Sequence, residues 1–400
     1  MATTFKSFSS NDVISTKTLL HEAVPITGTI CSGTYNDTAS PPNPLNVKNY
    51  AHGQFQSVYD YPYLSSSANH IFDIAIGYAG TSALSGATNQ RVQQKKKINI
   101  YNQMAQVLMG FDHQGKVQLF DEDGDLLAGG TKIDSAFFLN FSRLLVKDEI
   151  KKGSFSLDLM VGARSPHHPS TDFHQKIIRL ADTNAQNDYR VNSPAGEYGI
   201  LYATVSPVRS GQSDVLTTSD GTQKAGLIYY QAGIVVLTSS VLMANETGKP
   251  GAGSDQNTRG SGILHVNNHP ITASVRHPGG FNSSTSETLQ QLFTGSAITA
   301  SCDAIRSRIF NLSFNNTTEL NSTVYFCRAN HNEFNYSANP TYLTASKLRV
   351  KQQSTDTPVS FVTTVGLYSA DNELMAVAKL SEPLRKDPTN EMTLRVRLDY

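Results

Sequence analysis

The chain has 400 residues, of which 33 are basic and 33 acidic, so its formal net charge at pH 7 is zero. This balance argues against nucleic-acid binding, because proteins that hold DNA or RNA usually carry a basic excess that displaces phosphate counterions. Its 17 Tyr and 18 Phe argue against intrinsic disorder. Charged residues make up only 16% of the chain, below the roughly 25% of average soluble proteins. The uncharged polar residues that replace them suit strands, turns and protein–protein contact surfaces.

Cysteine usage and hydropathy indicate where the chain is made. Its three cysteines are an odd number at wide spacing, with no disulfide framework: Cys31, Cys302 and Cys327. The first residues lack the basic-then-apolar pattern of a signal peptide, so we expect synthesis in a reducing cytosol. The most apolar stretch, 227–243, is interrupted by polar residues and is shorter than the ~20 apolar residues of a membrane helix. It predicts two buried strands around a turn at Ala232–Gly233, and no membrane span.

Residues 1–50 read as an N-terminal arm. Val13, Leu19 and Leu20 follow a short helical pattern, and the closely spaced prolines of 40–44 exclude a helix or a central strand there. We expect this arm to lie against another part of the protein or against a partner.

Residues 51–300 predict a β-rich domain with one clear helix. His70–Ile76 alternates as a strand does. Ile98, Tyr101, Ala105 and Leu108 form one apolar stripe, with Gly110 placed as a C-cap, which predicts a helix near 95–110.

The same range holds further features that the spacing predicts. A second short helix is expected from Ser284 to Gly295. Two loop insertions, 164–192 and 246–262, have little to bury. The basic run 95–97 is expected on a solvated helix face or at a subunit contact.

Residues 301–400 predict a C-terminal antiparallel β domain. Strands are expected at 310–327, 359–368 and 374–380, with a hairpin turn at 370–372 and with Pro383 and Pro388 ending the third strand. In 391–400 one face should be buried: Met392, Leu394, Val396, Leu398 and Tyr400. The predicted fold class is therefore mainly β (α+β), with antiparallel sheets or a sandwich, a few short helices and long loops.

An acidic run is the first candidate for chemistry. Asp121, Asp123 and Asp125 alternate as the first ligands of a calcium loop do. However, the glycine stands at the fourth position instead of the sixth, and Lys132 replaces the glutamate of the twelfth. A turn joining strands at Leu119 and Leu126 is the favoured interpretation.

The remaining candidates lack their chemical partners. His167, His168 and His174 could bind zinc, but no cysteine or carboxylate pair completes the set, which favours an exposed loop. Cys327, His331 and Glu333 offer a nucleophile, a base and a deaminase-like His-x-Glu, but the Pro-Cys-x-x-Cys of those enzymes is missing, and Cys327 reads as a core thiol. The glycine-rich 249–253 matches no phosphate loop. We predict no catalytic, cofactor-binding or metal-binding residue, no cofactor, and no enzyme activity.

The chain end carries a resemblance. Val365–Tyr368, a turn at Asp371–Asn372, Glu373–Leu380, Pro383 and a last strand ending at Tyr400 follow one another. This succession resembles the closing module of phage baseplate-wedge and tail-fibre proteins. Four further segments resemble virion proteins of marine cyanobacterial contractile-tailed phages (myoviruses): 55–63, 192–199, 314–322 and 327–336.

The resemblance implies a structural component of a contractile phage tail, most like a baseplate wedge subunit that mediates assembly. It implies partners among the other tail and baseplate proteins, with a homodimer as one arrangement, and no catalytic residue. Three alternatives stay open: a neck or fibre-attachment protein of the virion, a carbohydrate-binding receptor module using the Tyr-rich segment near Tyr59, and a polysaccharide-degrading tailspike.

Overall fold

The computed structural model describes residues 5–32, 35, 44–85, 92–127, 131–160, 177–205, 223–239, 293, 298–306, 309–337, 343–345, 347–348, 353 and 355–400. The chain is mainly β, with antiparallel sheets and a few helices, which confirms the predicted fold class. It divides into two units. Unit 1 is Met1–Leu20 with Glu319–Tyr400, and unit 2 is His21–Thr318. These limits differ from the expected divisions after residues 50 and 300, because strands β1 (Val13–Thr27) and β15 (Ile309–Ala329) each contribute to both units.

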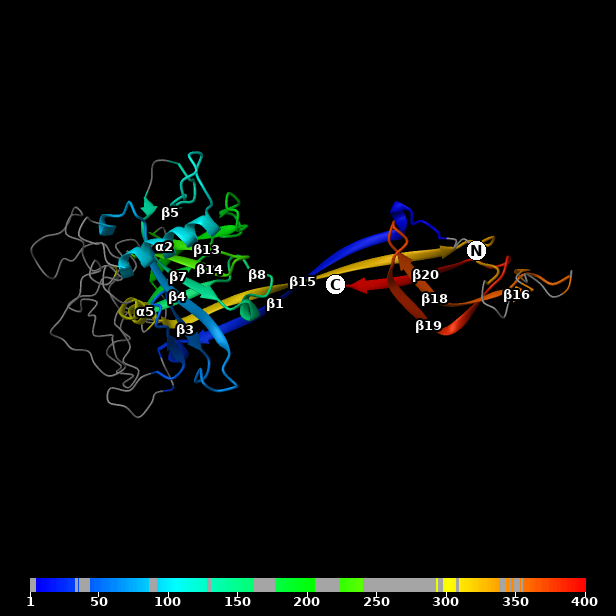
Figure 1. Ribbon diagram of the computed structural model, residues 1–400, viewed down its shortest axis with the longest axis horizontal. Coiled ribbons are helices and arrows are strands. Elements are labelled where there is room, and N and C mark those ends of the chain that lie inside the picture. The colour runs from blue at the N-terminus through cyan, green and yellow to red at the C-terminus, as the bar shows by residue number, and fades with distance from the viewer. Residues whose placement is uncertain are drawn as a thin grey trace, which may run out of the picture. The chain divides into compact units, whose positions relative to one another are not determined.

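Unit 2 is built on one large antiparallel sheet (Figure 1). The strand order is β1-β15-β9-β10-β12-β13-β14-β7-β4-β3-β2, and β11 pairs with β12 and β8 with β15. The strands that complete this sheet are β2 Val47–Asn49, β3 Phe55–Tyr59, β4 His70–Tyr78, β7 Ser135–Phe141, β8 Glu149–Ile150, β9 Ser156–Met160, β10 Ile177–Ala181, β11 Tyr189–Arg190, β12 Tyr198–Val205, β13 Gln223–Tyr229 and β14 Ile234–Thr238. A small separate ladder joins β5 Phe120–Asp121 and β6 Lys132–Ile133. The short helices are α1 Gly28–Ser32, η2 Ala83–Ser85, α3 Arg143–Val146 and α5 Thr299–Arg306.

Successive residues of the central strands enter two different hydrophobic cores. In β7, Phe137 and Leu139 belong to the first core and Phe138 to the second, as the alternation of side chains along a strand requires. Strands from both ends of the order contribute to the first core, through Ile26 of β1 and Val58 of β3. The sheet therefore curves around this core, and a strand buried on both faces reads as a continuous apolar run.

Helix α2 (Val92–Leu108), which lies beside the sheet in Figure 1, confirms the helix expected near 95–110. Its buried apolar residues belong to the second core. Gly110 ends the helix with a positive φ of 80°, and its N–H donates to the carbonyl of Ala105. The helix approaches β4 closely at Gly77, where a Cβ would stand 2.8 Å from the carbonyl oxygen of Lys97. Only glycine therefore permits this packing.

The sequence predicted a solvated helix face or a subunit contact for the basic run on α2, and Lys97 departs from the first of these interpretations. Lys95 is exposed and Lys96 donates to the carbonyl oxygen of His52 at 2.8 Å, but Lys97 is fully buried. The ammonium of Lys97 donates to the carbonyl oxygen of Phe293 at 2.7 Å. Burial lowers the pKa of Lys97 to about 8, because desolvation penalises the charged form.

Several other sequence predictions have outcomes in unit 2. The strand at His70–Ile76 is confirmed by β4, and the pair around Ala232–Gly233 by β13 and β14. The prediction of a loop at 164–192 is wrong for its described part, because this part contains β10 and β11. Strand β10 pairs with both β9 and β12. Loop 246–262 and the helix at Ser284–Gly295, Phe293 excepted, lie outside the described residues.

The helical pattern at Val13, Leu19 and Leu20 is also wrong, because these residues belong to β1. The run is rich in β-branched residues, which prefer strands. Within unit 1 the hydroxyl of Ser15 lies 3.2 Å from that of Thr323, which holds β1 beside β15. Non-local pairing thus overrides the local periodicity.

Unit 1 is a thin β assembly. Besides its parts of β1 and β15, it contains η1 Ser10–Asp12, β16 Leu343–Thr344, β17 Lys347–Leu348, β18 Ser360–Tyr368, β19 Leu374–Lys386 and β20 Met392–Asp399. Strand β20 pairs with β15 over eight residues, and β18 pairs with β19 in a two-stranded sheet.

The predicted hairpin turn is confirmed: Asn372 has a φ of 63°, and the N–H of Ser369 donates to the carbonyl of Glu373. Pro383 does not end the strand, however, but lies inside β19 beside a break in register opposite Thr363, where a proline costs no ladder hydrogen bond.

The final strand alternates as predicted but is buried less than expected. Val396 is buried, Met392, Leu394 and Leu398 are half-buried, and Tyr400 is 74% exposed. Among the described residues, no helix is both long and apolar enough to cross a membrane.

We predict that two leucine substitutions in unit 2 separate core burial from surface exposure. Leu139→Ala, at a fully buried position of β7, should lower the free energy of unfolding by about 2–5 kcal/mol. Leu144→Ala, at a side chain that is 80% exposed, should change it by less than about 0.5 kcal/mol. Urea unfolding followed by circular dichroism measures both, and equal losses would contradict the assignment of the core.

Candidate functional site

The acidic loop Asp121–Leu127 begins at a firmly anchored point. Phe120 is fully buried in the second core, and its N–H donates to the phenolic oxygen of Tyr101 at 3.4 Å. The short β5–β6 ladder pairs Asp121 with Lys132. The loop therefore leaves the core at a fixed position, with Asp121 as its first residue.

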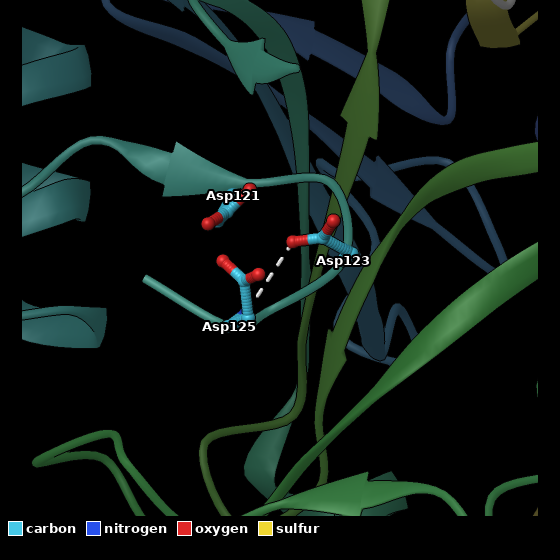
Figure 2. A group of neighbouring side chains, drawn as sticks. All are labelled: Asp121, Asp123 and Asp125. Atoms are coloured by element: carbon cyan, nitrogen blue, oxygen red, sulfur yellow. Dashed lines mark hydrogen bonds between the residues drawn. The ribbon is translucent and has the colours of Figure 1, made fainter. Parts of the chain in front are cut away.

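Three carboxylates converge within this loop (Figure 2). One ligand oxygen from each of Asp121, Asp123 and Asp125 lies within 4.8 Å of the others. Asp121 is fully buried, Asp123 is half-buried and Asp125 is exposed, so the group opens to solvent on the Asp125 side.

Lysine and main-chain groups balance part of this charge. The ammonium of Lys132 lies 2.5 Å from Asp121 Oδ2 and 2.5 Å from the carbonyl oxygen of Leu127. Lys224 lies 3.6 Å from Asp123. Burial raises the pKa of Asp121, Lys132 opposes this rise, and the neighbouring Asp123 adds to it.

The structure corrects two reasons for which the sequence favoured a plain turn. No strand lies at Leu126; the loop joins β5 to β6 instead. Leu126, at the sixth position counted from Asp121, has a φ of 61°, the left-handed conformation that glycine provides in calcium loops. Gly124, at the fourth position, also has a positive φ of 69°, and a Cβ there would lie 3.1 Å from Tyr198 Oη, so this position favours glycine as well.

The Tyr-rich segment forms a second candidate site, an aromatic cluster at the edge of the sheet. The ring of Tyr59 lies 5.5 Å from that of His70 and 6.2 Å from that of Tyr63. Lys48 Nζ lies 4.8 Å from the Tyr50 ring centroid and 5.8 Å from that of Tyr63. Flat rings with polar groups beside them can stack against a sugar and hydrogen-bond its hydroxyls.

A serine, an aspartate and a histidine meet beside this cluster, but not in the order of a hydrolase triad. Ser57 Oγ donates to Asp73 Oδ1 at 2.5 Å, and His70 Nε2 lies 2.7 Å from the same oxygen. A triad needs the histidine to contact the serine hydroxyl as its base. Here the Asp73 carboxylate lies between them, so this geometry does not place the imidazole of His70 as a base for Ser57.

The residues around Cys327 do not assemble a catalytic site either. Cys327 is only half-buried, not the core thiol expected, and burial raises its pKa, which disfavours the thiolate. Glu333 is bonded by Lys6 and by the N–H of Asn330, while His331 accepts hydrogen bonds from Lys386 and Asn335 through its main-chain oxygen. The histidines 167, 168 and 174 and the glycine-rich 249–253 lie outside the described residues.

A buried polar network in unit 2 escaped the sequence analysis. Arg306 donates to Asp303 at 2.7 Å and to the carbonyl oxygen of Cys31 at 2.7 Å, and Gln56 bonds both Asp303 and Arg306. Each guanidinium nitrogen finds an acceptor, so the network is structural and ties α5 to α1 and β3. The spacing of Asp303 and Arg306 by three residues was the only signal in the sequence.

Unit 1 carries a third candidate, an exposed apolar surface on the β18–β19 hairpin. Its large exposed apolar side chains are Phe361, Tyr368, Leu374, Met375, Val377 and Leu384, of which Met375 is the most exposed at 70%. A surface of this kind suits contact with another protein rather than chemistry.

Comparisons of the chain with protein-family models, with curated proteins and with solved structures find no match. The candidate sites therefore rest on their geometry alone.

The three thiols should differ in reactivity by their burial. Cys31 and Cys302 are fully buried, and burial raises the pKa of Cys31 to about 12. We expect Cys327 alone to react with iodoacetamide in the native protein, and slowly, and all three to react in urea. Mass spectrometry of the alkylated peptides checks this, with Cys327→Ala as the control; rapid native labelling of Cys31 would contradict it.

Proposed function

We propose that the chain is a structural component of a contractile phage tail, most like a baseplate wedge subunit that mediates assembly with other tail proteins. The segments whose sequence resembles such proteins include the β18–β19 hairpin and the end of β20. The observation that carries the proposal is the packing of unit 1, whose described residues form almost no hydrophobic core of their own.

Both hydrophobic cores of the described chain lie wholly in unit 2. In the described part of unit 1 the buried apolar side chains are Val324, Leu367 and Val396. A unit with so few buried apolar side chains usually needs a metal, disulfides or a partner to be stable. Of these, the exposed apolar surface of the hairpin favours stabilisation by a partner protein.

The backbone of the hairpin supports the same proposal. β18 and β19 pair only with each other among the described strands, so their outer edges offer unpaired N–H and C=O groups. An isolated two-stranded hairpin is marginal in water, and exposed edges readily add a strand from another chain. Assembly would bury both the edge and the apolar side chains.

We predict that charges on this surface block assembly without unfolding the protein. Met375→Asp with Val377→Asp should leave the melting temperature within a few degrees of wild type, because both side chains are largely exposed. Incorporation into particles, measured by mass spectrometry of purified virions of the virus that encodes the chain, should fall at least tenfold.

Val191→Asp is the matched control, an apolar side chain of unit 2 that is 69% exposed. It should be incorporated normally. Normal incorporation of the hairpin variant, or absence of the wild-type chain from virions, would contradict the proposal.

A carbohydrate-binding receptor module is the second candidate, and the aromatic cluster at Tyr59 favours it. Tyr61, near the cluster, is 42% exposed, and Lys48, His70 and Asp73 supply hydrogen-bonding groups. If this candidate holds, Tyr63→Ala with Tyr61→Ala should weaken binding of the purified protein to a glycan array, while particles assemble normally and fail to adsorb. If the wild-type protein binds no glycan on the array, the receptor-module candidate is excluded.

A further inference from the structure

We propose that the acidic loop Asp121–Leu127 is a calcium-binding site in which the ammonium of Lys132 holds the metal position when calcium is absent. This inference does not depend on the proposed function.

The first argument is the spacing of the carboxylates. Calcium binds oxygen ligands at about 2.3–2.6 Å, so two ligands of one ion lie no more than about 5 Å apart. The ligand oxygens of Asp121, Asp123 and Asp125 lie within 4.8 Å of one another. They can therefore share one ion after small shifts of the Asp123 and Asp125 side chains, and Figure 2 shows the three carboxylates facing a common space.

The second argument is a buried oxygen that lacks a partner. Asp121 is fully buried, and its Oδ1 makes no hydrogen bond to any described residue, while Oδ2 accepts from Lys132 and from the N–H of Leu126. Its neighbours in the group are the carboxylates of Asp123 and Asp125. The carboxylate as a whole is paired with Lys132, but a buried oxygen without a hydrogen bond is costly. Ionised carboxylates cannot donate hydrogen bonds, so a cation satisfies this oxygen best.

The third argument is what Lys132 contacts. Its ammonium bridges Asp121 Oδ2 and the carbonyl oxygen of Leu127, the first and seventh positions of the loop. A carboxylate and a main-chain carbonyl at these positions are the ligands of a helix-loop-helix calcium site. The Lys132 side chain is 26% exposed and can swing out to solvent when a divalent ion enters.

The charges around the loop set the expected affinity. Lys132 and Lys224 both lie beside the carboxylates. Their positive charges repel a divalent ion and so weaken its binding. We therefore expect a dissociation constant of about 0.1–1 mM for calcium, in the range of weak extracellular calcium modules. Magnesium should bind less well, because it demands a near-ideal octahedron and releases its water reluctantly.

The test uses the full chain and calcium chloride, with terbium as a luminescent probe. The phenol of Tyr198 donates to the carbonyl oxygen of Gly124 and can sensitise terbium bound in the loop.

Lys132→Met, which keeps the aliphatic stem and removes the charge, should tighten calcium binding by about tenfold or more. Asp125→Asn, at the exposed ligand, should weaken it by about tenfold without disturbing the buried part of the loop. Asp371→Asn, at an exposed residue outside the site, is the control and should change nothing.

Calorimetry with calcium and with magnesium, and circular dichroism for folding, complete the experiment. Absence of calcium binding in both the wild type and Lys132→Met at about 10 mM would overturn the site and indicate a proton shared between the carboxylates. Binding that Asp125→Asn leaves unchanged would also overturn it. A folded Lys132→Met protein that binds calcium no more tightly than wild type would overturn the role of Lys132.

Discussion

The hydrogen-bonded backbone of β15 is the feature on which both units depend. This strand of 21 residues places Ile309, Leu312 and Phe314 in the first core of unit 2, where it pairs with β8 and β9. Its later residues pair with β20 in unit 1 over eight successive positions. Because a strand buries alternate residues and bonds through its whole backbone, one continuous strand can supply a core to one unit and a ladder to the other.

The two units are stabilised by different interactions. Unit 2 buries large apolar surfaces on both faces of its central strands, so hydrophobic burial dominates its stability. In unit 1 the buried groups include polar ones, such as Lys386, whose ammonium donates to Asn335 at 2.7 Å and to the main-chain oxygen of Asp387 at 2.9 Å. A ladder with few buried apolar side chains gains stability when another protein covers it, which is the physical basis for proposing an assembly role.

The acidic loop illustrates how charge is managed beside a hydrophobic core. Phe120 fixes the loop start in the second core, and this position forces the carboxylate of Asp121 out of water. Lys132 and a main-chain N–H compensate one oxygen of that carboxylate and leave the other without a hydrogen bond from any residue that the structure describes. The loop thus combines the requirements of a turn with those of a cation site.

The sequence alone determined the features that local spacing encodes. The apolar stripe ending at Leu108, the alternating His70–Ile76 and the turn at Asn372 were all predictable, because periodicity and turn chemistry act over a few residues. Only the tertiary structure decided the rest. Val13–Leu20 became a strand through pairing with β15, and Lys97 became buried against the carbonyl of Phe293. The folding of the β5–β6 loop brought Asp121, Asp123 and Asp125 around one space and set Lys132 among their oxygens. Such contacts form between segments that are distant in the sequence. Their free energy depends on both segments and cannot be inferred from the residues of one segment alone.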